Sequence, residues 1–333
     1  AAGLGVLAFG RASFWRRCAQ CFIVGAIPLM VIGLHVWWRT GYYDDLLPNT
    51  FHAKVGVDLA TRMADVWRYL YRSAVLAIPA VTLGVLMLPF ILGRRIWRLR
   101  LGRVAAYLAG CVLAQGIYVI WSGGDHMPAA RVLAGVIGPG CLLLGLGAAT
   151  LGRGARQIVI IASLSVMVLA AFESRPLGMN PAAYIGRIVG SYIADAWPEG
   201  SVVALNTAGS TPFVAQNNAY IDMLGLNDRE IGTREDVPIR TARQRMSGHS
   251  KGDGASVLRR TPGYIILGPA EGRPATDPWF LSDLEISESP DFKACYAMHQ
   301  IELPRDESWP AGPAPVQPPL SFTYYKRTCE TAL

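Results

Sequence analysis

The chain has 333 residues, of which 52% are hydrophobic and only 17% are charged. A soluble domain carries about a quarter charged residues, so the composition favours a membrane protein. The net charge of +7 does not indicate nucleic-acid binding, because the arginines flank apolar segments and form no basic face with interleaved aromatic residues. Nearly all long apolar runs lie in residues 1–172, which we expect to be a transmembrane helical region. Residues 173–333 have the mixed composition of a globular domain.

The first residues, AAGLGVLAFG, form a short apolar run that is followed by Arg11. This run is too short to cross about 30 Å of hydrocarbon, and a signal peptide would carry its positive charge before the apolar run. We therefore expect the run to be the end of a transmembrane helix, and the chain to be the C-terminal part of a larger protein.

Later apolar runs approach the roughly 20 residues that a transmembrane helix needs. They lie at 18–37, 73–92, 104–121, 132–151 and 157–172. We count four complete spans, or five with the short last run. Arginine clusters precede the first run, separate the second from the third, and separate the fourth from the fifth. Because such clusters stay in the cytoplasm, residues 39–72, the link between the third and fourth runs, and the region after 173 should face outward.

The outward loop ends in a segment, 57–72, with apolar residues at helical spacing. It predicts either an amphipathic helix in the membrane interface or an ordinary packed helix of a loop domain. After residue 180 the pattern changes to α/β. A helix is expected at 181–197, followed by short hydrophobic strands at 201–206, 219–226 and 263–269. This alternation predicts a small three-layer α/β domain.

The cysteines divide between the two regions. Cys295 and Cys329 are the only two in the expected outer domain, and an oxidising compartment would favour a disulfide between them. The other cysteines lie in or beside the predicted spans, where cysteine behaves as a small apolar residue. Cys18 and Cys21 form a CxxC, but no second pair completes a metal site.

Two polar segments at the expected outer interface contain candidate site residues. The first is GYYDDLLPNTFHAKVG at 41–56, with two adjacent carboxylates and Lys54. A lysine at headgroup depth suits a lipid phosphate, whereas the simpler alternative is a solvated connector. The second is SGGDHMPAAR at 122–131, in which Asp125 and His126 could serve as acid–base or metal groups. One such pair does not predict a metal site, and the alternative is a tight hairpin whose Asp caps a helix.

The pattern YY-x-x-LLPNT-x-x-AK-x-G, followed by GGD-x-M-x-x-x-R, resembles the multi-spanning glycosyltransferases with the C-type fold. The closest in pattern are the actinobacterial terminal arabinofuranosyltransferases and their uncharacterised bacterial homologues. The phrases ALNTAGSTP, IDMLGLND, GHSKGDG, YIILGP and FTYYKR resemble the extracytoplasmic domain of those homologues. The resemblance implies an inverting enzyme of the bacterial plasma membrane that moves a sugar, arabinofuranose being one candidate, from a polyprenyl-phosphate carrier to an outer acceptor glycan.

The resemblance also suggests roles for particular residues. Lys54 and Arg131 would bind the donor phosphate, and their charge would stabilise the leaving group. Tyr43, Asn49 and Asp125 fall on the family's patterned positions and are expected to bind substrate. Asp44, Asp45 and His126 are added as substrate-binding candidates because they lie in the same two polar segments. His126 departs from the family pattern, where an aromatic residue is common. The family takes its general base from an Asp in an earlier outer loop, so no residue of this sequence is assigned that role.

Other functions stay open at this point. A transporter subunit or a glycan-binding scaffold would also span the membrane, although transporters place polar residues within their spans and these spans contain few. An envelope-polymer ligase would use the same lipid carriers. No cofactor is assigned, and a divalent cation is left as an alternative. The expected partners are the lipid-linked sugar donor, the acceptor glycan and the bilayer.

Overall fold

The computed structural model describes residues 13–55, 59–60, 63–71, 101–124, 131–173, 181–246, 248–305 and 319–329. The chain divides into two compact units. The helical unit comprises Ala1–Pro48 and Val66–Arg175, and the α/β unit comprises Asn49–Asp65 and Pro176–Leu333. Thus the segment 49–65, which the sequence assigns to the membrane region, groups with the C-terminal domain.

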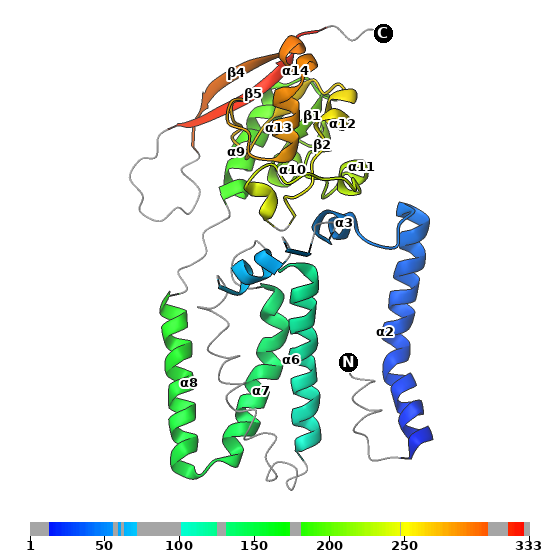
Figure 1. The fold of residues 1–333 in the computed structure, drawn as a ribbon, viewed down its shortest axis with the longest axis vertical. Helices are drawn as coiled ribbons and strands as arrows, with labels where there is room; N and C mark the ends of the chain where they lie inside the picture. Colours follow the sequence, from blue (N-terminus) through cyan, green and yellow to red (C-terminus); the bar gives the residue numbers. More distant parts are fainter. Residues whose placement is uncertain are drawn as a thin grey trace. The chain divides into compact units, whose positions relative to one another are not determined.

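The helical unit contains long apolar helices (Figure 1). They are α2 (Phe14–Tyr43), α6 (Gly102–Ser122), α7 (Ala134–Thr150), preceded by the 3₁₀ turn η1 (Arg131–Leu133), and α8 (Arg153–Glu173). Helices α6 and α7 pack through Ala105, Leu108 and Leu143.

Within the described residues, three helices are long and apolar enough to cross a membrane: Phe14–Tyr43, Gly102–Ser122 and Arg131–Thr150. They correspond to the first, third and fourth apolar runs of the sequence. The second run, 73–92, lies outside the described residues. The fifth run forms α8, which opens with two arginines and is not one of the three. The protein therefore has the apolar helices of a membrane protein, and the described residues contain three candidate spans among the four predicted runs that lie within them.

The α/β unit is built on a five-stranded sheet with the order β2-β1-β3-β5-β4. The strands are β1 (Val202–Leu205), β2 (Ala219–Asp222), β3 (Tyr264–Ile266), β4 (Tyr296–Leu303) and β5 (Leu320–Arg327). Strands β2, β1 and β3 are parallel, whereas β5 runs antiparallel to both β3 and β4. Its helices are α3 (Asn49–Val55), α9 (Pro181–Ala196), α10 (Ser210–Val214), α11 (Arg229–Gly232), α12 (Gly254–Arg259), α13 (Leu281–Glu288) and α14 (Pro290–Cys295).

Side chains alternate between the two faces of the sheet, as the pleat requires. On one face, Val203 and Leu205 pack with Ile193 of α9. On the other face, Ala204 and Ile265 pack with residues of α11 to α14. Both faces are covered by helices, so the domain has the three α/β/α layers that the sequence predicts.

Two details of the α/β unit bear on the sequence predictions. A disulfide joins Cys295 and Cys329, the expected pair, and ties the end of β5 to the start of β4. The strand expected at 219–226 ends at Asp222. It stops there because the Asp222 carboxylate accepts hydrogen bonds from the backbone N–H groups of Leu224 (3.0 Å) and Asn227 (2.8 Å), which turn the chain into a loop.

Candidate functional site

The helix α3, with the sequence NTFHAKV, is fixed to the α/β unit by two hydrogen bonds. Asn49 Nδ2 donates to the carbonyl of Gly225 at 3.0 Å, and Ser250 Oγ donates to the carbonyl of Ala53 at 3.3 Å. Ala53 is completely buried. The helix is therefore a packed element of the domain, unlike a solvated connector.

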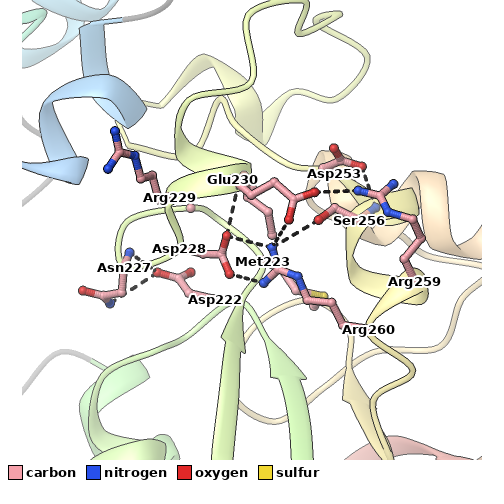
Figure 2. Close-up of polar contacts among 12 residues, drawn as sticks. Asp222, Met223, Asn227, Asp228, Arg229, Glu230, Asp253, Ser256, Arg259 and Arg260 are labelled. Carbon is pink, nitrogen blue, oxygen red and sulfur yellow. Dashed lines mark hydrogen bonds and ion pairs between the residues drawn. The ribbon is translucent and has the colours of Figure 1, made fainter. Parts of the chain in front are cut away.

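The first support of α3 is the loop that follows β2, residues 223–228. Asp222, at the end of β2, is only 4% exposed and receives the N–H groups that shape the loop. Burial raises the pKa of Asp222 above its usual value, and the hydrogen bonds from Asn227 and Leu224 partly offset that rise. Figure 2 shows this carboxylate beside Asn227. Gly225, which accepts the hydrogen bond from Asn49, thus belongs to a well-ordered turn.

An ion-pair cluster holds the far end of this loop (Figure 2). Asp228 caps α11 by accepting from Ile231 N, and it pairs with Arg260. Arg260 also pairs with Glu230 at 2.6 Å. These contacts hold the pKa of Glu230 below its usual range, the hydrogen bond from Arg260 being the largest cause.

The second support of α3 is the loop 238–252, which is organised by Gln244. This side chain is fully buried, and all of its hydrogen-bonding groups are used. Its Oε1 accepts from Arg240 N (2.7 Å) and Thr241 N (2.8 Å), and its Nε2 donates to Pro238 O (2.7 Å) and Ser250 O (3.1 Å). A single amide therefore sets the position of Ser250, which in turn holds α3.

Lys54 lies at the junction of the two loops. A Cβ placed on Gly248 would be 3.6 Å from Lys54 Cε and 3.8 Å from Leu226 Cδ2, so the lysine stem lies beside Gly248, where the two loops come close to each other. Lys54 is partly exposed. Lys251, three residues after Gly248, is only 3% exposed; its ammonium group donates to the carbonyl of Arg234, and burial lowers its pKa. Lys54 is thus a partly exposed cation on a fixed helix.

The carboxyl ends of the parallel strands, where α/β folds often bind ligands, are filled by protein groups. Asn206 Nδ2 donates to Asp283 Oδ1 at 2.7 Å and to Gly268 O at 3.1 Å. Asp283 is completely buried. Burial raises its pKa, and the hydrogen bonds that it accepts oppose that rise.

A cavity of about 270 Å³ elsewhere in the unit is lined by Arg234, Asp253, Glu285 and Glu288. Two of these residues, Arg234 and Glu285, pair with each other at 2.9 Å.

The other predicted site residues are distributed as follows. Tyr43, Asp44, Asp45 and Arg131 belong to the helical unit, whereas Asn49 and Lys54 belong to the α/β unit. Tyr43 ends α2, 5.2 Å from the guanidinium of Arg39, and Asp44 caps that helix in the left-handed conformation. Asp45 Oδ1 accepts from Leu47 N at 2.9 Å. Arg131 is exposed at the start of η1. Asp125 and His126 lie outside the described residues.

The structure adds three residues to those predicted: Gly225, Gln244 and Ser250. Gly225 and Ser250 lie in IDMLGLND and GHSKGDG, which contribute to the family resemblance, but the sequence does not show that they contact α3. Gln244 lies outside both segments. Among the residues that the structure describes, no group of three or more His, Cys, Asp or Glu is arranged to hold a metal ion.

Comparison with known proteins gives one partial match. Residues 180–312 match a family described as a domain of unknown function (DUF8728). The matched residues run from the start of α9 to beyond β4 and do not include α3. No curated protein matches the chain, and no solved structure does.

Proposed function

We propose that the protein is a membrane glycosyltransferase that moves a sugar from a polyprenyl-phosphate carrier to an outer cell-envelope glycan. The observation that carries this proposal is the attachment of α3 to the α/β unit by Asn49 and Ser250. The segment that most resembles the family is thereby a structured element, which the alternative of a solvated connector does not explain. The candidate spans support the membrane setting.

In the proposed reaction, the lipid phosphate leaves with increasing negative charge as the sugar is transferred. A cation that is already in position stabilises this charge without reorganisation during the reaction. Lys54 suits this role because its helix is held at both ends and its stem packs beside Gly248. Arg131 is proposed as the second cation, and Tyr43, Asp44, Asp45, Asp125 and His126 as residues that contact the substrates.

We assign Asn49 a different role from the substrate binding that the resemblance implies. Its amide N–H group is used to hold Gly225. In addition, a Cβ on Gly232 would be 2.9 Å from Asn49 Oδ1, so the amide is closely surrounded by protein. Asn49 is therefore proposed to position Lys54. The disulfide Cys295–Cys329 supports an extracytoplasmic location for this unit, since disulfides persist in oxidising compartments.

Substitution of Lys54 tests the proposal. Sugar transfer would be measured in membranes that contain the full chain, with a panel of polyprenyl-phosphate sugars that includes arabinofuranose. We expect Lys54→Met to lower the turnover of the accepted donor by about 100-fold, the effect of removing one group that stabilises a developing oxyanion. Lys293→Met is the matched control, because Lys293 is an exposed lysine of the same unit. Full activity of Lys54→Met, with the control also active, would contradict the proposal.

A further inference from the structure

Trp279 in the α/β unit lies between two arginines. The guanidinium carbon of Arg243 is 4.0 Å from the centroid of the indole ring, and that of Arg273 is 4.1 Å from it. Two guanidinium groups at these distances do not fit over one face of an indole, so they occupy opposite faces. A stacked arginine uses its flat face, and the N–H donors at its edge point away from the ring.

The stack is held in place by the buried carboxylate of Asp283. Its Oδ2 accepts from the backbone N–H groups of Trp279 (3.2 Å), Phe280 (2.9 Å) and Gly268 (3.1 Å). Arg273 packs its stem over Gly268, where a Cβ would be 3.0 Å from Arg273 Cγ. One carboxylate therefore fixes both the tryptophan and the backbone on which the second arginine rests.

Arg243 is held from the other side. It begins η2 (Arg243–Arg245), directly before Gln244, whose buried amide closes the loop 238–252. The backbone of Arg243 is thus fixed by the same residue that positions Ser250. An arginine whose backbone and flat face are both restrained loses little further freedom when it binds a ligand.

The charge of Arg243 is the unusual feature of this stack. The arginines at 234, 240, 259 and 260 pair with Glu285, Glu288, Glu230 and Asp228, and Arg273 pairs with Asp277. Within the described residues, Arg243 has no carboxylate partner, and its hydrogen bond goes to the Met246 sulfur at 3.9 Å. It is exposed. A fixed, exposed guanidinium without a counter-charge is suited to bind an external anion.

We propose that the Arg243–Trp279–Arg273 stack binds the oxyanion of an acidic glycan, either a carboxylate or a phosphate ester. Arg243 donates two parallel N–H bonds to the oxyanion, the geometry that a guanidinium favours. Arg273, whose charge is balanced by Asp277, stacks on Trp279 and supports the ring against which Arg243 rests. The oxyanion is assigned from the chemistry of the stack alone; that it belongs to a glycan, and that this glycan is the acceptor of sugar transfer, rests on the proposed function. A bilayer surface fits less well, since membrane attachment favours exposed apolar side chains beside the cations and both faces of Trp279 are covered.

The test is a binding measurement that involves no sugar transfer. The full chain in nanodiscs of neutral lipid would be titrated with glucuronate and glucose 6-phosphate, with glucose as the uncharged control, and binding followed by ligand-observed NMR. We expect both anions to bind and glucose not to bind. Arg243→Gln should weaken anion binding at least 10-fold. Arg243→Lys should weaken it less, because the charge stays but the paired donors are lost. Arg259→Gln, a change in an exposed arginine paired with Glu230, should leave binding unchanged.

Three results of the titration would count against the anion site. Equal anion binding in Arg243→Gln and the parent protein would overturn the proposal, and so would absence of anion binding in the parent. Vesicles that contain anionic phospholipid form a further arm of the titration, and binding to them without binding of either free anion would assign the stack to the membrane surface instead. Trp279→Leu provides a second variant, expected to weaken anion binding by loss of the stack. Because donor and acceptor are absent, failure of the glycosyltransferase proposal would leave these results unaffected.

Discussion

The two units of the chain differ in where their apolar side chains lie. In the helical unit, α2 has no buried residue, and its Leu34 and Trp37 are 56% and 75% exposed. In the α/β unit, Phe322, Ile193 and Ile265 are completely buried. Soluble monomers rarely expose large contiguous apolar surfaces to water. The helical unit therefore needs a hydrocarbon environment, whereas the α/β unit contains its own core.

The same difference extends to residues that usually mark tight packing. Cysteines of the helical unit, such as Cys141 in α7, are free thiols, whereas the α/β unit uses its pair as a cross-link. For glycines of α2 and α6 such as Gly33 and Gly110, a Cβ would meet no side chain or other segment of the described residues within 4 Å. Matched substitutions in the two units should therefore have different effects.

Loss of the disulfide should give the largest effect. The bond between Cys295 and Cys329 closes a loop with a sequence separation of 34, for which the chain-entropy relation gives a stabilisation of about 4 kcal/mol. We expect Cys295→Ala with Cys329→Ala to lower the unfolding temperature of the α/β unit by about 10 °C, measured by scanning fluorimetry in nanodiscs. Cys141→Ala should change it little. Unchanged stability in the double variant would show that the cross-link does not stabilise the unit.

A glycine substitution should give the next largest effect. Gly272 has a φ of +74°, and a Cβ there would be 1.7 Å from the carbonyl oxygen of Thr323. The backbone must shift to admit a methyl group, and the left-handed conformation adds about 1 kcal/mol. We expect Gly272→Ala to destabilise the α/β unit by about 3 kcal/mol in chemical denaturation. Gly110→Ala in α6 should be neutral or slightly stabilising. If Gly272→Ala and Gly110→Ala changed stability equally, the two units would not differ in how tightly these glycines are packed.

The fold could be predicted from the sequence where residues repeat at a regular spacing. The apolar runs identify α2, α6 and α7, and short hydrophobic stretches identify β1 and β3. Strand β4 gives no such signal, because among its residues only Leu303 is buried. It lies at the edge of the sheet, where one side of the strand has no neighbour and the side chains are mostly exposed.

The candidate site could be predicted only in part. Lys54 is identified by its motif, but the residues that hold its helix are far away in the chain. Asn49 and Gly225 are 176 residues apart, and Ser250 and Ala53 are 197 apart. Neither contact follows from local propensity or periodicity. The role of Gln244 could not be predicted either. A glutamine in a polar segment is normally expected at the surface, and only the fold shows that it is buried.

The smallest predicted effect concerns the buried cation of Lys251. Burial lowers its pKa from the usual value of 10.5, so the folded state releases this proton more readily than the unfolded state. Stability therefore rises with pH, through the lowered pKa and up to 10.5, as the cost of the buried charge is removed. Lys251→Met lacks this titration and also lacks the hydrogen bond to Arg234, which is worth about 1 kcal/mol. We expect the free energy of unfolding of the variant to be within about 1 kcal/mol of that of the parent at pH 7. Between pH 7 and 10 the parent should become more stable than the variant.

The measurement is the difference in unfolding free energy between parent and variant at successive pH values, which cancels titrations that both proteins share. Lys293→Met serves as the control, because the side chain of Lys293 is exposed. Its unfolding free energy should change with pH in parallel with that of the parent. Parallel curves for Lys251→Met as well would mean that the cation is solvated. Lys251 would then lie outside the core, and the loop that holds α3 would be open to water.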